Sequence, residues 1–350
     1  MDTKGVIRPG RPWLDTAGRR IQAHGGSILF EDGVYHWYGE NKERTDGSPG
    51  IWHWGVRSYR STDLVNWEDE GLIIPPRPDE PGHPLHPASM MDRPHVVRCP
   101  RTGRYVAWLK IMERDGTQTE TVLAADRFLG PYEVLRTGLR PLGMSAGDFD
   151  LALAPDGKAY YYFERVHSEL ICADLTEDCT DVTGYYSTHF PQPHPPYVRE
   201  APAHFVRRGK HYLITSGTTG YCPNPSELAV ADTWHGPFRV LGDPHPGDPT
   251  RTSFHSQVSS VFKVPGKKDL YVALADRWLP GDMARPYEIT RDYFASCFGE
   301  KNEEAERAWR ALPPPGSNTS VADYVWLPFR FEGEMGYLDW RDEWSPADFD

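Results

Sequence analysis

The chain repeats one short pattern five times. Each copy has a turn glycine, followed two to five residues later by a tyrosine that opens a strand-like run. The copies are spaced by 52 to 70 residues: Gly33–Tyr35, Gly103–Tyr105, Gly157–Tyr160, Gly209–Tyr212 and Gly266–Tyr271. Glycine marks tight turns, and the aromatic and β-branched residues that follow favour strands. A period near 50 residues is typical of propellers, in which each repeat is one antiparallel blade.

A second series of polar residues lies upstream of the glycines. Each member precedes its glycine by nine residues, or by eleven in the second copy, and opens a short apolar strand: His24, Asp92, Asp148, Glu200 and Gln257. Equivalent positions on successive blades converge at the propeller axis. We therefore predict an all-β protein, a five-bladed β-propeller forming a single domain over residues 1–350. Its blades open near these five residues, which we expect to form one site.

Helix is scarce in this sequence. The best candidate is the Glu-rich stretch 302–312, within a polar insertion at about 280–320 that we expect on the surface. Residues 324–331 predict a final strand. Because a propeller must close its ring, we expect this strand to join a blade together with N-terminal residues.

Charge and composition exclude several classes of partner. The net charge is −12 and there is no dense run of Lys or Arg, so we expect no nucleic acid or membrane partner. The five cysteines lack zinc-binding spacing and are odd in number, which favours reduced thiols. No apolar stretch approaches 18 residues, and residues 1–5 do not resemble a secretory signal. We therefore expect a cytoplasmic protein, or a secreted one if an export segment was trimmed.

Three of the five series residues are acidic, namely Asp92, Asp148 and Glu200. Inverting glycoside hydrolysis needs a protonated acid at the leaving oxygen and a base on the opposite face, ~6.5–9.5 Å away. Different blades can hold carboxylates at such separations around an axis. A further carboxylate nearby raises the pKa of the acid through like-charge repulsion. The pattern thus favours an oligosaccharide or polysaccharide partner.

Six short segments carry the resemblance to a known family: Gln22–Gly26, Trp37–Asn41, Ser61–Trp67, Arg199–Ala203, Thr215–Gly220 and Ser256–Gln257. Together they resemble family 43 glycoside hydrolases and, more narrowly, the exo-β-1,3-galactanase branch. The resemblance runs from about Arg11 to Pro328. The Arg-Glu-Ala-Pro and His-Gly-Gly motifs are fairly specific, whereas Ser-Thr-Asp-x-x-x-Trp marks only the propeller superfamily.

The resemblance implies roles for three residues. Glu200 becomes the general acid, and Asp148 becomes the group that tunes its pKa and orients it. Most of the family has an aspartate base on the first strand of blade one, where this chain has His24 and no carboxylate. The galactanase branch shares this loss and places a glutamine near the water, which matches Gln257. A neutral amide is a poor base, so Gln257 either orients the water or relays a proton through its imidic tautomer.

The resemblance also departs at two positions. It leads us to expect glutamate where this chain has Asp92, and arginine where it has His255. Candidate sugar-binding residues are Glu40, Asp92, His24, Thr219, Asn224 and Trp278, the last as a stacking platform. Each has a structural alternative: salt bridges between blades for Glu40 and Asp92, core packing for His24 and Trp278, and turn formation for Thr219 and Asn224.

The leading hypothesis is an inverting exo-glycoside hydrolase that releases galactose from β-1,3-galactan or arabinogalactan. One alternative is a furanosidase acting on arabinofuranose or galactofuranose with the same acid. Another is a non-catalytic sugar-binding propeller, which the missing blade-one carboxylate supports. The resemblance implies no organic cofactor. Ligand spacing does not support a metal site, although an axial calcium or other ion near His24 or His255 stays open.

Overall fold

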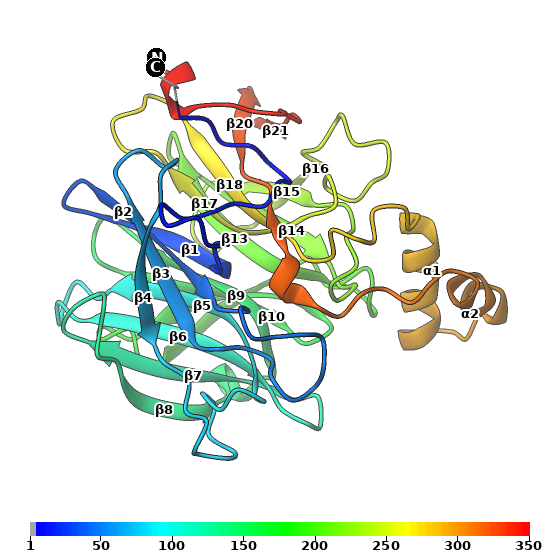
Figure 1. Cartoon of the computed structure of the whole chain (residues 1–350), viewed down its shortest axis with the longest axis horizontal. Helices are drawn as coiled ribbons and strands as arrows, with labels where there is room; N and C mark the ends of the chain where they lie inside the picture. The colour runs from blue at the N-terminus through cyan, green and yellow to red at the C-terminus, as the bar shows by residue number, and fades with distance from the viewer. Residues whose placement is uncertain (1–4) are drawn as a thin grey trace.

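Five antiparallel sheets surround one axis in the computed structural model, which describes residues 5–350 (Figure 1). Residues 1–4, part of the start that we predicted not to be a secretory signal, lie outside the described residues. The sheets have strand orders β1-β2-β3-β4, β5-β6-β7-β8, β9-β10-β11-β12, β13-β14-β15-β16 and β17-β18-β20-β21, with short β19 also pairing with β18. This architecture confirms the predicted five-bladed β-propeller.

The first strand of each sheet lies innermost. These strands are β1 (His24–Glu31), β5 (Met90–Arg98), β9 (Ala146–Leu153), β13 (Arg199–Arg207) and β17 (Gln257–Lys263). Each contacts the first strand of both neighbouring blades, and β17 contacts β1, so the ring is closed. The five polar series residues therefore lie at or close to the starts of the strands around the axis.

The repeated tyrosines lie on the second strands and are all buried. These strands are β2 (Val34–Glu40), β6 (Tyr105–Met112), β10 (Ala159–Arg165), β14 (Lys210–Gly217) and β18 (Tyr271–Arg277). The outer strands are β3 (Val56–Ser61), β4 (Glu68–Ile74), β7 (Gln118–Ala125), β8 (Glu133–Leu139), β11 (Glu169–Leu175), β12 (Val182–His189), β15 (Glu227–Ala231), β16 (Arg239–Gly242), β20 (Leu327–Glu332) and β21 (Met335–Leu338).

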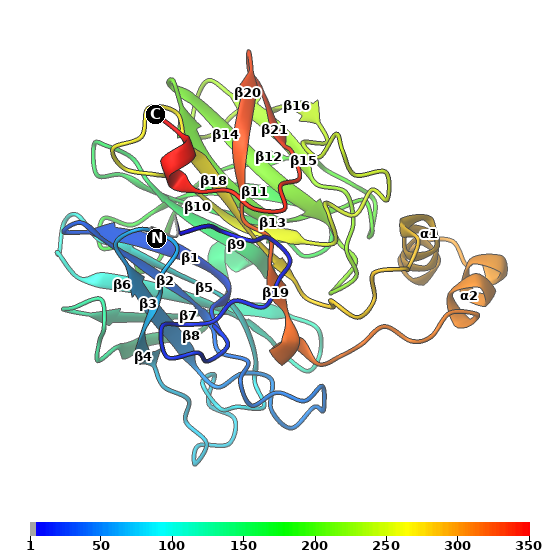
Figure 2. The same ribbon diagram turned by 45° about the horizontal axis from the view of Figure 1, so that its top comes forward.

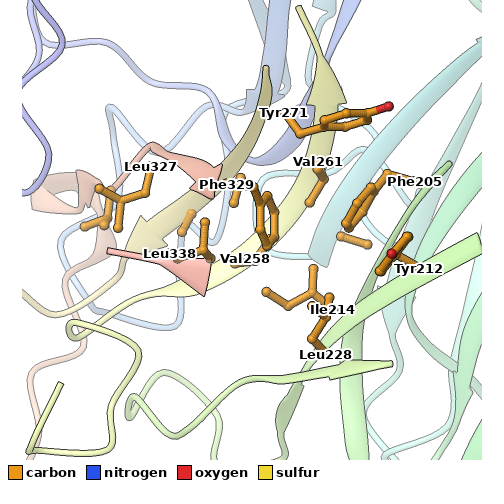
Figure 3. Close-up of a cluster of buried hydrophobic side chains, with 14 of the residues drawn as sticks. Phe205, Tyr212, Ile214, Leu228, Val258, Val261, Tyr271, Leu327, Phe329 and Leu338 are labelled. Carbon is orange, nitrogen blue, oxygen red and sulfur yellow. The ribbon is translucent and has the colours of Figure 1, made fainter. Parts of the chain in front are cut away.

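Apolar packing between the blades holds the ring together. Each of the five largest buried clusters draws its residues from two adjacent blades. Figure 3 shows the cluster between blades four and five, where Phe205 and Tyr212 face Val261 and Phe329. Removing such apolar surface from water is the main stabilising contribution. The core therefore lies between the sheets, which leaves the axis free for polar side chains.

Every inner strand has a β-bulge near its start. Regular pairing is interrupted between His24 and Ser27, Asp92 and His95, Ala146 and Phe149, Glu200 and Ala203, and Val258 and Ser260. Three residues that follow a series residue have positive φ: Gly25 (61°), Arg93 (53°) and Ala201 (48°). Bulges redirect side chains and are frequent beside active sites, and positive φ strains the two residues that are not glycine. The repeated bulge thus gives each blade an irregular strand start at the axis.

The C-terminal strand prediction is confirmed, with a different partner. Tyr324 is the last residue of β19 (Asp323–Tyr324), and residues 327–331 lie in β20. Both strands pair with β18 of blade five. The N-terminal segment adds only isolated bridges, Ile7 with Trp344 and Arg11 with Tyr324. Blade five is therefore completed by the C-terminal segment, with the N-terminal segment lying alongside it.

The insertion between β18 and β19 carries two helices, α1 (Tyr287–Phe298) and α2 (Glu303–Arg310). Helix α2 confirms the prediction, and the Asn302 side chain caps it by accepting hydrogen bonds from two backbone N–H groups. Sequence inspection missed α1, whose Tyr, Phe, Ile and Thr residues also favour strands. Figures 1 and 2 show both helices beside the ring of strands.

None of the helices described in residues 5–350 is long and apolar enough to cross a lipid bilayer.

Candidate active site

A cavity of about 280 Å³ lies where the inner strands begin. All five blades contribute to its lining: Glu40, Asp92, Asp148, Glu200 and Gln257 each come from a different blade. Four of the five series residues therefore meet in one cavity, as their register predicts. The fifth, His24, is replaced in the lining by Glu40, which pairs with it across β1 and β2.

Asp148 is held by two buried cations. Lys110 Nζ donates a hydrogen bond to Asp148 Oδ1 at 2.7 Å, and Arg93 Nη2 lies 2.9 Å from Asp148 Oδ2. Burial disfavours the ionised carboxylate, but the charges of Arg93 and Lys110 outweigh it and lower the pKa of Asp148 to about 2. Asp148 is therefore a permanent negative charge in the cavity at neutral pH.

Glu200 has the opposite electrostatic environment. Burial raises the pKa of the Glu200 carboxyl well above its usual range, and the negative charges of Asp148 and Glu164 raise it further. Lys110 and Arg93 act against this effect but do not reverse it. Glu200 is still partly exposed to the cavity. The two acids thus lie in opposite electrostatic environments, because the pKa of Glu200 is raised and that of Asp148 is lowered.

The amide of Gln257 is fully engaged. Its Oε1 accepts hydrogen bonds from Arg93 Nη2 and from Trp278 Nε1 at 3.3 Å. Its Nε2 donates to Ser216 Oγ at 2.8 Å and to Glu200 Oε1 at 3.2 Å. A flipped amide would place its N–H groups against two other donors, so the network sets the orientation. The imidic tautomer needs an acceptor for its hydroxyl proton, and both groups at Oε1 are donors. This environment therefore favours the amide form.

Asp92 and Glu40 form a second charged group on blades one and two. Trp52 Nε1 donates a hydrogen bond to Asp92 at 2.8 Å, and Lys110 Nζ lies 3.4 Å from Asp92. Burial opposes the ionisation of Asp92, but the charges of Lys110 and Lys42 outweigh it and lower the pKa of Asp92. Lys42 Nζ lies 2.7 Å from Glu40. Burial raises the pKa of Glu40 to about 7, opposed by Lys42 and assisted by Asp92. Both carboxyls line the cavity and also make ion pairs.

His24 and Trp278 differ in their access to the cavity. His24 is completely buried, with its ring nitrogens 2.9 Å from Asp276 and 3.1 Å from Gln22. Burial lowers the pKa of His24, which favours the neutral ring. His24 stacks on Tyr324 and does not line the cavity. Trp278 does line it, and its indole N–H contacts Gln257.

Thr219 and Asn224 organise the loop after β14 and do not line the cavity. Asn224 bonds both backbone groups of Gly217 and also the Thr219 hydroxyl. His255 lies outside the cavity, and its Nδ1 is buried without a hydrogen-bond partner. Within residues 5–350, no cluster of three or more His, Cys, Asp or Glu side chains is placed to hold a metal ion.

Sequence reasoning missed the cations of the site. Arg93 follows Asp92 directly, and Lys110 is a charged residue inside the apolar strand β6. A lysine within such a strand is the signal that could have identified it, since buried lysines need a partner. The aromatic residues Trp52 and Tyr221 were also missed; they stack with ring centroids 6.1 Å apart at the cavity.

Comparison with known families identifies the chain. The model of glycosyl hydrolases family 43 matches residues 27–293. The chain belongs to this family. Curated protein sequences give no significant match.

Solved structures of family 43 enzymes resemble the whole chain. A family 43 β-1,3-galactosidase shares 26% sequence identity with this protein, with a TM-score of 0.79. The alignment covers 99% of this chain and 65% of the galactosidase chain. A second, solved with galactodeoxynojirimycin, shares 28% identity with a TM-score of 0.77, covering 97% of this chain and 100% of its own. An exo-β-1,3-galactanase from Clostridium thermocellum shares 27% identity with a TM-score of 0.74, covering 97% and 66%. This chain thus spans about two thirds of the length of the first and third of these proteins.

Proposed function

We propose that this family 43 member is an inverting exo-glycoside hydrolase that releases galactose from β-1,3-galactan or arabinogalactan-type glycans. The similar structures support the substrate, because their names describe β-1,3-galactosidases and an exo-β-1,3-galactanase. The polar side chains that line the cavity, Glu40, Asp92 and Gln257 among them, suit the hydroxyl groups of a terminal sugar.

The observation that carries the proposal is the contrast between Glu200 and Asp148 in one cavity. Two carboxyls whose environments push their pKa values apart are typical of a general acid and its partner. We assign Glu200 as the acid that protonates the glycosidic oxygen, because its pKa is raised by burial and by Asp148. Asp148 stays ionised between Arg93 and Lys110, so it keeps the proton on Glu200 until the bond breaks.

We assign the water-positioning place to Gln257. Its Nε2 reaches Glu200, so the same amide also orients the acid. Its Oε1 accepts from two donors, which argues against proton relay through an imidic tautomer. Inversion requires the water to attack from the face opposite Glu200, and the product then has the α configuration.

The decisive experiment is incubation with β-1,3-linked galactooligosaccharides, with the anomeric configuration of released galactose followed by NMR. We expect α-galactose as the first product. Glu200→Gln should lower kcat by roughly 10²–10⁴-fold, the usual contribution of a general acid. The exposed Glu133→Gln is the matched control.

Other outcomes distinguish the alternatives. Turnover of arabinofuranosides or galactofuranosides, with none of the β-1,3-galactosides, would replace the proposal by a furanosidase. Sugar binding in calorimetry without any product would indicate a non-catalytic propeller. Undiminished release by Glu200→Gln would remove the assigned acid.

A further inference from the structure

The helical insertion is not needed to build blade five. Strand β18 ends where β19 begins to pair with it, with Asp276 opposite Tyr324 and Arg277 opposite Asp323. Residues 278–322 therefore leave the sheet and return to the position next to their departure. A short turn could make the same connection. The connection between β18 and β19 therefore does not account for the presence of the two helices.

The two helices pack as a firm unit. Tyr293 of α1 stacks on Trp309 of α2, with ring centroids 4.3 Å apart and planes 5° from parallel. The guanidinium of Arg285, before α1, lies over the Trp309 ring, 4.4 Å from its centroid, and donates a hydrogen bond to Asp282 at 2.7 Å. The Asn302 cap begins α2. Aromatic stacking and helix capping within the insertion thus stabilise the two helices against each other.

Helix α1 places two phenylalanines at the cavity. Phe294 and Phe298 are four residues apart, so they lie on the same face of the helix. Both line the cavity that contains Glu200, Asp148 and Gln257, and Met112 from β6 lines it as well. Phe298 is 48% exposed, which leaves much of its ring open to a ligand. An exposed apolar surface at an active site is a candidate binding surface.

The contacts of α1 place this apolar wall on the side of the acid. The Phe298 ring lies 5.3 Å from the His167 ring, edge to face. His167 Nδ1 lies 2.9 Å from Glu164, whose charge acts on Glu200. Gly299, at the end of α1, lies so close to His194 that an added Cβ would come within 2.4 Å of its Nε2. The helix therefore extends from blade five to a loop of blade three and to the segment that leads into β13, the strand on which Glu200 lies.

The side of the acid is the side of the leaving group, because a general acid protonates the oxygen that departs. We propose that Phe294 and Phe298 of the insertion form the leaving-group subsite. They would bind the apolar C–H face of the pyranose ring that leaves, while the charged and polar side chains of the cavity bind the terminal sugar. This inference rests on the proposed function. It names the substrate class more narrowly: glycosides whose leaving group is a pyranose presenting an apolar face.

The test compares two substrates that share a glycosyl part and differ in the leaving group. β-1,3-Galactobiose has a leaving pyranose, whereas β-galactosyl fluoride has a leaving group too small to reach the phenylalanines. In the double variant Phe294→Ala/Phe298→Ala, the kcat/KM ratio of disaccharide to fluoride should fall about ten-fold or more, as for lost apolar contacts in a specificity pocket. Phe294→Leu/Phe298→Leu keeps an apolar side chain but removes the flat ring, and we expect an intermediate fall.

Cys297→Ala is the matched control, because this exposed residue lies on α1 and does not line the cavity. Its ratio should equal that of the wild type. General damage to the fold would lower both kcat/KM values together and leave the ratio unchanged. If both double variants turn over the two substrates at wild-type rates, so that the ratio is unchanged, the subsite is overturned. If the wild-type enzyme itself turns over neither substrate, the proposed function is overturned instead.

Discussion

The guanidinium of Arg93 lies 2.9 Å from the carboxylate of Asp148, and both side chains are buried at the axis of the propeller. The two residues come from adjacent blades, so the pair forms only when blades two and three pack against each other. Burial opposes the charge on Asp148, and the cations overcome that opposition to give a pKa of about 2. The pair therefore delivers a fixed negative charge to the neighbourhood of Glu200.

Removing that charge should move the pH profile. Glu200 is active as an acid only while protonated, so activity is lost as pH rises through its pKa. Asp148→Asn removes a charge that raises the pKa of Glu200. We expect the alkaline limb of kcat/KM for β-1,3-galactobiose to shift to lower pH, with the exposed Asp126→Asn as control. An alkaline limb that stays in place would show that Asp148 does not tune the acid.

The same carboxylate should influence folding stability at low pH. A group whose pKa is depressed in the folded state contributes stability that is present above its unfolded pKa and is lost as pH falls through the folded value. For Asp148 this window runs from near pH 4 down to about 2. Its lowering corresponds to about 2 kcal/mol, since each unit is worth ~1.36 kcal/mol. Urea unfolding between pH 5 and 2 should show a smaller loss of stability in Asp148→Asn than in the wild type. Parallel losses would contradict the lowered pKa.

The sequence could predict the blades and most of the carboxyl groups, because both repeat in register along the chain. The sequence could not predict that the side chain of His24, which occupies the same register, is buried in the protein interior and does not line the cavity. The first strand is closely packed there: a Cβ on Gly26 would come within 1.9 Å of the Tyr38 carbonyl oxygen. His24 instead pairs with Asp276, 252 residues away in the sequence.

The cations and the apolar wall were also beyond the sequence. Lys110 lies on a second strand, outside the repeated series, and its partner Asp148 belongs to another blade. Helix α1 has strand-forming residues, and its Phe298 packs against His167 of blade three, far away in the sequence. Such contacts depend on how the blades pack against one another, which local propensity does not encode.

Glu40 provides a test of the second charged group. Burial raises its pKa to about 7, so in the folded state it binds a proton that the unfolded chain releases near pH 4.5. A raised carboxyl pKa means that stability falls as pH increases from about 4.5 to 7. Glu40→Gln should flatten this part of the profile, measured by urea unfolding at pH 5 and pH 8. An equal fall in wild type and variant would show that Lys42 keeps Glu40 ionised throughout.

Gln257→Glu should act in the direction opposite to Asp148→Asn. The new carboxylate would keep its contacts with Arg93 and Trp278, but it would replace the N–H group that donates to Glu200 Oε1. A like charge at this position disfavours ionisation of Glu200 and raises its pKa further. We expect the alkaline limb of kcat/KM to move to higher pH. The exposed Gln192→Glu, which makes the same change of charge, should leave the limb unchanged. If Gln257→Glu leaves it unchanged too, the contact between Gln257 and Glu200 does not govern the acid.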